Sequence, residues 1–232
     1  LMKGNVNLTL YENLLVNAYG SAASGQQIGY FHTSAIDRFL RERGLHDEID
    51  IFVIDTSPSL SLLNRIIFLG ADYFVVPMMP DAFSVQGIEN LGSVFEGWKK
   101  NWQISGKALA GNTENKFVLF GDGLFVGYIV NSYNVYGKQP IHDHRHWIEE
   151  IPGKVKKYLS EKHGRNGLVE KSWKNPLAII QDYGRIPAKC QELGVAIFDL
   201  DPKVIEEIHI GTKENIEKSR EEFAELSQHI LT

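Results

Sequence analysis

Cysteine is nearly absent from this chain, since Cys190 is the single cysteine among 232 residues. One cysteine excludes an intramolecular disulfide framework and any multi-cysteine zinc or iron–sulfur site within one chain. The sequence also lacks an uninterrupted apolar run of roughly 18 to 20 residues, the length that a membrane-crossing helix needs. We therefore expect a protein of the reducing cytoplasm that does not enter a membrane.

Basic residues are not in excess either, because the net charge is −5. This balance argues against a uniformly basic nucleic-acid-binding protein, although a local basic face is compatible with it. Hydrophobic residues make up 43% of the chain and charged residues 23%, which is enough apolar material for a sizeable core.

Short apolar runs bounded by polar residues predict buried parallel strands, and stretches with helical apolar spacing lie between them. Strands are predicted at residues 49–55, 72–77, 124–130 and 195–198. Helices are predicted from Tyr11, around 36–43, at 60–69, 84–98 and 142–163, and from Glu214 onward, with a loop at 99–115. The alternation predicts one α/β domain whose predominantly parallel sheet carries helices on both faces.

Asp55 ends the first predicted strand and is followed by Thr56, Ser57 and Pro58. A carboxylate at the carboxyl end of a parallel strand lies where open α/β sheets bind ligands. Magnesium keeps several waters and is held by one or two carboxylates plus phosphate oxygens, so such an aspartate can orient a metal-bound water. Taken alone, an aspartate after a short apolar run is more often simply the cap of the following helix.

The order of several segments along the chain resembles the ParA/MinD family of P-loop ATPases. The segments are GNVNLTLYE at 4–12, DIFVIDTSPSL at 50–60, ADYFVVP at 71–77, PDAFSVQG at 80–87, FVGYIVN at 125–131, GRIP at 184–187 and LGVAIFDLDP at 193–202. The similarity spans nearly the whole chain but is poor near 99–120 and 137–175, which we interpret as polar insertions. Ser57 departs from the family pattern, which has a proline there.

The resemblance implies ATP and Mg²⁺ as cofactors and assigns site residues. Asp55 would orient a magnesium-bound water, and Thr56 and Pro58 would belong to the switch turn that senses the terminal phosphate. Asn131, together with Ile186 and Pro187, would contact the adenine base.

The glycine-rich phosphate loop of this family, K-G-G-x-G-K-T-[TS], does not occur in the sequence. Its backbone amides cradle phosphates, and its lysine reaches the terminal phosphate oxygens. We therefore interpret residues 1–232 as a single incomplete ParA-like domain that lacks the N-terminal strands and the P-loop. On this interpretation the chain by itself should not hydrolyse ATP.

Between residues 152 and 175 there are seven lysines and arginines against two glutamates. A local excess of positive charge can track the phosphates of DNA, although a solvated helix face gives the same pattern. The candidate DNA-binding residues are Lys154, Lys156, Lys157, Lys162 and Arg165.

The sequence thus supports two hypotheses. In the first, the chain belongs to a partition-type ATPase that alternates between an ATP-bound homodimer and a released state. It would position DNA or another cargo with a ParB-like partner that stimulates hydrolysis. In the second, it is a diverged or truncated, non-catalytic family member that acts as a protein- or DNA-binding module.

Overall fold

The computed structural model describes residues 8–57, 59–109, 117–119, 121–133, 135–136, 139–140, 142–164, 173–208 and 213–231. The chain divides into two compact units. Unit one comprises residues 1–74 and 94–124, and unit two comprises residues 75–93 and 125–232. The single domain predicted from the sequence stays a prediction.

Unit one is mainly helical. It contains α1 (Leu8–Ala23), α2 (Gln27–Thr33), α3 (Ala35–Asp47), α4 (Leu62–Gly70) and the part of α5 (Ala82–Leu109) that follows Ser93. Leu15, Ala18 and Ala22 are buried on α1, at the spacing of one helix face. The backbones of α1 and α2 approach so closely at Gly29 that a Cβ there would lie 2.2 Å from the Ala22 amide nitrogen.

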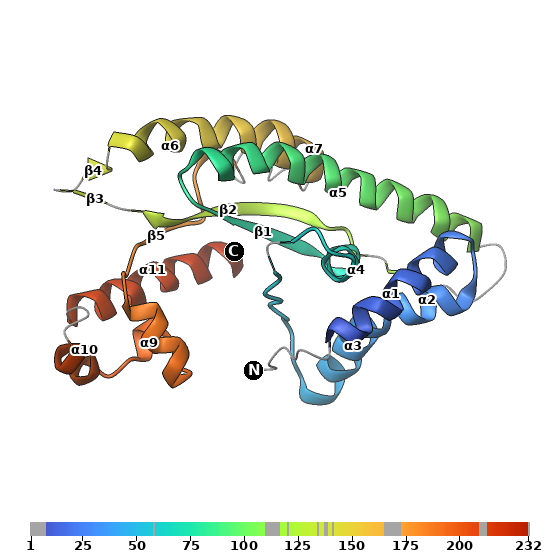
Figure 1. Ribbon diagram of the computed structural model, residues 1–232, viewed down its shortest axis with the longest axis horizontal. Helices are drawn as coiled ribbons and strands as arrows, with labels where there is room; N and C mark the ends of the chain where they lie inside the picture. The colour runs from blue at the N-terminus through green and yellow to red at the C-terminus, as the bar shows by residue number, and fades with distance from the viewer. Residues whose placement is uncertain are drawn as a thin grey trace. The chain divides into compact units, whose positions relative to one another are not determined.

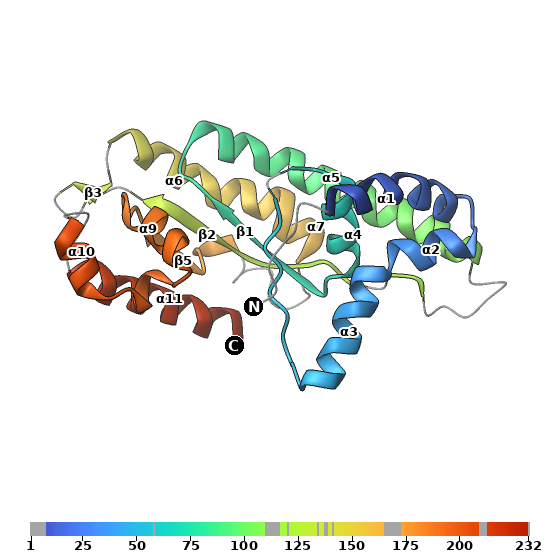
Figure 2. The ribbon, with the colours of Figure 1, turned by 60° about the horizontal axis from the view of Figure 1, so that its bottom comes forward.

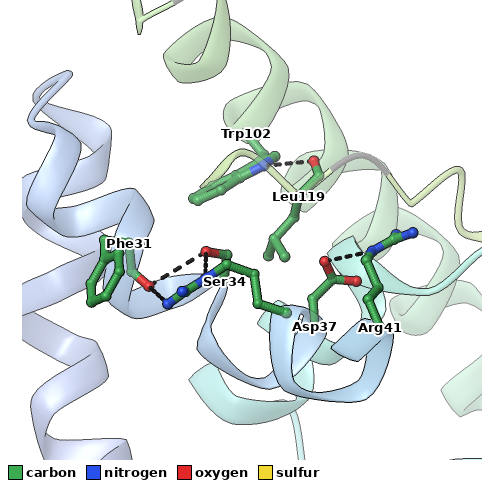
Figure 3. Close-up of polar contacts among 7 residues, drawn as sticks. Phe31, Ser34, Asp37, Arg41, Trp102 and Leu119 are labelled. Atoms are coloured by element: carbon green, nitrogen blue, oxygen red, sulfur yellow. Dashed lines mark hydrogen bonds and ion pairs between the residues drawn. The ribbon is translucent and has the colours of Figure 1, made fainter. Parts of the chain in front are cut away.

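Aromatic side chains fill the core of unit one around Trp102. The Trp102 ring stacks on Tyr19 with centroids 5.6 Å apart and lies 5.2 Å from the ring of Tyr30. Its indole Nε1 donates a hydrogen bond of 3.1 Å to the carbonyl oxygen of Leu119, as Figure 3 shows. The core tolerates a tryptophan here because its buried indole N–H keeps a hydrogen-bond partner.

Figure 3 also shows the ion pair between Asp37 and Arg41 on α3, with 2.9 Å between Oδ2 and Nε.

Unit two holds most of the sheet. Strands β1 (Tyr73–Met78), β2 (Leu124–Tyr133) and β5 (Ala178–Gln181) lie in the order β1-β2-β5, and β2 and β5 are parallel. A two-stranded sheet, β3 (Val135–Tyr136) and β4 (Gln139–Pro140), follows β2. The register pairs Ile129 with Ala178 and is irregular between Val130 and Tyr133.

The helices of unit two cover both faces of this sheet. One face of the three-stranded sheet is covered by the start of α5 and by α6 (His142–Val155), which continues through the π-helix η2 (Lys156–Ser160) into α7 (Glu161–His163). The other face is covered by α11 (Lys213–Leu231), as Figure 1 shows. The remaining helices are α9 (Ile186–Leu193), the 3₁₀ turn η3 (Ile197–Asp199) and α10 (Pro202–Ile208). The predicted α/β fold, a parallel sheet with helices on both faces, is confirmed.

The strand predicted at residues 49–55 is wrong. These residues form an extended segment between α3 and α4 (Figure 2), and Val53 is 92% exposed. A strand is stabilised by the backbone groups of its neighbours, and no described strand pairs with this segment. The segment therefore keeps the apolar side chains of a buried strand without its pairing.

The strand predicted at residues 195–198 is also wrong. Ile197 to Asp199 form the 3₁₀ turn η3, because the backbone hydrogen bonds close locally: the Leu200 amide donates to the Ile197 carbonyl over 3.2 Å. Residues 99–109, predicted as a loop, continue α5, since Trp102 anchors that stretch in the core. Strand β5 was missed because four residues carry too little pattern.

Candidate functional site

A pocket of about 360 Å³ opens at the carboxyl ends of the paired strands β2 and β5. Its lining comes from five elements of unit two and combines apolar walls with amide and carboxylate groups. The lining residues are Ile129, Asn131, Ile180, Gln181, Asp182, Tyr183, Pro187, Ile197, Phe223 and Leu226. Concave sites of this kind, mostly apolar with a few polar groups, are typical of small-molecule binding.

Local structure explains how Asn131 reaches this pocket. Ile129 pairs with Ala178 and Tyr133 with Gln181, so β2 has one residue more than β5 between these pairs. Such an irregularity re-aims side chains, and the half-buried Asn131 lies within it. An asparagine amide offers a donor and an acceptor, which suits the edge of a nucleobase.

The structure brings Asn131 and Pro187 to the same pocket. Ile186 is not among the residues that line this pocket and is buried in the neighbouring core. Pro187 lies in the first turn of α9, where a proline is accommodated because its missing N–H has no helical partner there. Ile186 is 1% exposed and belongs to the core cluster with Cys190 and Ile205. Burial raises the pKa of the Cys190 thiol.

Sequence reasoning missed the turn after β5 and the contribution of α11. Tyr183 is buried, and its hydroxyl donates to Glu222 Oε2 over 2.9 Å. Burial, with the neighbouring Glu222 carboxylate, raises the pKa of Tyr183. The signal that could have found this wall was the apolar stripe of the C-terminal helix, which includes Phe223 and Leu226.

Asp55 and Thr56 lie in unit one, on the exposed extended segment before α4. Pro58 lies outside the described residues. Because Asp55 and Asn131 belong to different units, their joint role in one site stays a prediction.

Asn64 of α4 binds the turn that follows Asp55. Its side-chain nitrogen donates to the carbonyl oxygen of Ser57 over 2.7 Å and also to the carbonyl oxygen of Ser59. The two serine hydroxyls lie 2.8 Å apart, and Ser61 caps α4 by accepting from the Asn64 amide. Sequence reasoning noted Ser57 in place of a proline but missed the asparagine seven residues later.

Within the described parts of the chain, no group of three His, Cys, Asp or Glu residues could hold a metal ion. Asp55, a single exposed carboxylate, suits the magnesium of a metal–nucleotide complex, since that ion takes most of its ligands from water and phosphate.

The predicted basic surface lies on α6 and η2. Lys154 and Lys157 both approach the Tyr158 ring, at 5.7 and 4.8 Å from its centroid, and Lys156 lies 4.9 Å from the ring centroid of Trp173. Lys154 Nζ also lies 3.9 Å from Glu89 Oε2. Lys162 follows in α7, and Arg165 lies outside the described residues. Three lysine side chains therefore lie against two aromatic rings on this surface.

None of the helices that the structure describes combines the length and the apolarity needed to cross a membrane.

The parallel sheet and its helices on both faces define an α/β protein with a pocket at the strand ends. The crystal structure of protein DIP2308 from Corynebacterium diphtheriae shares this fold, with a TM-score of 0.59 and 20% sequence identity. The similarity covers 70% of this chain and 55% of that one.

A family model described as an AAA domain matches residues 3–106. The virulence plasmid ParA family protein pGP5-D of Chlamydia psittaci is 38% identical over 47 residues, which are 20% of this chain and 18% of that protein. A ParA family protein of Chlamydia pneumoniae is 35% identical over 69 residues, 27% of each chain. These matches support a ParA-like family member, and the chain matches less than a third of the length of either relative.

Proposed function

We propose that this chain carries the base-binding and switch segments of a partition-type ATPase. The observation that supports it is the pocket of about 360 Å³ at the ends of β2 and β5. Asn131 and Pro187, which the family resemblance assigns to the adenine base, both line this pocket. The protein would alternate between an ATP-bound homodimer and a released state, and a ParB-like partner would stimulate hydrolysis.

In this scheme the base enters the pocket of unit two. The apolar side chains of Ile129, Ile197 and Phe223 would contact its faces, and the Asn131 amide would donate to and accept from its edge. Magnesium would neutralise phosphate charge when it binds with ATP. Asp55 would orient a water molecule bound to that ion. Thr56 would belong to the switch segment that senses the terminal phosphate.

Asn131→Ala should weaken adenosine binding by about tenfold, because it removes both a donor and an acceptor at the base edge. Adenosine is the appropriate probe, since it needs no phosphate-binding loop. Affinity is measured by titration calorimetry on the 232-residue chain. Asn90→Ala, at an exposed position of α5, is the matched control and should bind like the wild type. A wild-type chain that does not bind adenosine would contradict the base site.

Replacing Lys154, Lys156 and Lys157 by alanine should weaken duplex DNA binding and reduce its salt dependence. Each lost phosphate contact lowers the slope of log affinity against log salt by about 0.9, so the slope should fall by about 3 units. Fluorescence anisotropy at several salt concentrations measures it. The control replaces Lys189 of α9, Lys203 of α10 and Lys213 of α11, and should keep the slope. An unchanged slope in the variant without Lys154, Lys156 and Lys157 would show that this surface is an ordinary solvated helix face and does not bind DNA.

The second candidate function is a non-catalytic DNA-binding module. The lysine and aromatic surface of α6 and η2 favours it, because that surface needs no nucleotide. The two candidate functions make different predictions about the polypeptide that the complete gene encodes. A K-G-G-x-G-K-[ST] loop in that polypeptide, with magnesium-dependent ATP hydrolysis, supports the ATPase, and a complete reading frame without the loop supports the module.

A further inference from the structure

Helix α11 forms one wall of the pocket in unit two. Phe223 and Leu226 of this helix line the pocket, together with Gln181 at the end of β5 and Tyr183 in the turn after it. Figure 1 shows α11 on the same side of the sheet as α9. The volume open to a base therefore depends on where α11 sits against β5.

Glu222, next to Phe223 in the sequence, links α11 to this turn. Its Oε2 accepts hydrogen bonds from the Gln181 backbone N–H at 3.2 Å and from the Tyr183 hydroxyl at 2.9 Å. Its side chain is 13% exposed, and its Oε1 lies 3.9 Å from Lys218 Nζ. Lys218 in turn donates to the side-chain oxygen of Gln181. Hydrogen bonds to an ionised carboxylate are about twice as strong as neutral ones. The two bonds that Glu222 accepts therefore hold α11 in a defined position against Gln181 and Tyr183.

A second contact holds α11 at its other end. Strand β5 is the last in the sheet order, so it has an edge without a strand partner in the described sheet. The Gln181 N–H near this edge bonds to Glu222, and the Leu177 carbonyl oxygen lies 2.6 Å from His229 Nδ1. Phe223 and Leu226 lie between these two contacts along the helix. The pocket wall is thus positioned by a backbone group at each end of β5, the Gln181 N–H and the carbonyl of Leu177, the residue before the strand.

We propose that Glu222 is a positioning residue for the base pocket. Through the Gln181 amide and the Tyr183 hydroxyl it holds Phe223 and Leu226 at the distance that a nucleobase needs. This assignment rests on the proposed function, since it concerns the same pocket.

The test compares adenosine affinity in the wild type, Glu222→Ala, Glu222→Gln and the control Glu225→Ala. Glu225 is exposed and one turn from Glu222 on the same helix. Glu222→Ala should weaken adenosine binding by about tenfold, because two donors lose their acceptor. Glu222→Gln keeps an acceptor oxygen and should stay within about threefold of the wild type, and Glu225→Ala should equal it.

Hydrogen exchange separates this role from simple stabilisation of the fold. Adenosine should slow exchange of the Gln181 amide in the wild type and should not do so in Glu222→Ala. If Glu222→Ala does not fold by circular dichroism, Tyr183→Phe removes one donor to the same carboxylate and should weaken adenosine binding by about threefold.

The outcomes are distinct. Wild-type affinity in a folded Glu222→Ala, or in Tyr183→Phe where that variant carries the test, overturns the role of Glu222 and leaves the base site standing. A wild-type chain that does not bind adenosine overturns both the base site and the role of Glu222.

Discussion

Gly29→Ala is expected to lower the free energy of unfolding by about 3 kcal/mol, the upper end of the usual cost of overpacking. A Cβ at Gly29 would lie 2.2 Å from the Ala22 amide nitrogen and 2.5 Å from the Ala18 carbonyl oxygen. Both atoms belong to the backbone of α1, so relief requires α1 and α2 to move apart. Urea denaturation followed by circular dichroism measures the change.

Gly20→Ala is the matched control for this prediction. Gly20 lies in α1, and a Cβ there meets no atom within 4 Å. Alanine stabilises a helix over glycine by roughly 0.5 to 1 kcal/mol, so this variant should be slightly more stable than the wild type. Equal stabilities for Gly29→Ala and Gly20→Ala would show that α1 and α2 do not pack as described.

Asp55→Ala is expected to reduce magnesium-dependent ATP hydrolysis by about 100-fold or more in the polypeptide that the complete gene encodes. The carboxylate is proposed to position a metal-bound water, and loss of one preorganised electrostatic group commonly costs that much. Phosphate release at saturating ATP and magnesium is the measurement. Adenosine affinity should be unchanged, because the base pocket is in unit two.

Asp50→Ala provides the control for Asp55→Ala. Asp50 lies on the same exposed extended segment, five residues earlier, and has no assigned role. Its turnover should match the wild type within about twofold, as expected for an exposed substitution away from the chemistry. Unchanged turnover in Asp55→Ala would refute the role given to that carboxylate.

The sequence predicted the elements whose own pattern decides their structure. Helix α11 and the start of α5 have apolar residues at helical spacing, and strands β1 and β2 are apolar runs with neighbours in the sheet. The run at 49–55 has an equally strong strand pattern, yet it is exposed. A strand depends on what lies beside it, and the sequence of the strand itself does not contain that information.

Only some of the residues that line the pocket could be predicted from the sequence, because the others depend on contacts between distant positions. Asn131 and Pro187 were found because their segments follow a family pattern. Gln181, Tyr183 and Glu222 contribute through contacts between residues about 40 positions apart, such as the bond between Tyr183 and Glu222. No local motif marks such pairs, since each residue is ordinary at its own position.

Asn64 has a thermodynamic consequence for the turn after Asp55. A proline at position 57 would limit the backbone in the unfolded chain as well as in the folded one, and so would reduce the entropy lost on folding. Asn64 instead restrains the Ser57 and Ser59 carbonyl groups only once α4 has formed. Order in this turn is therefore gained cooperatively with the first turn of α4, and any condition that frays that helix also releases the turn.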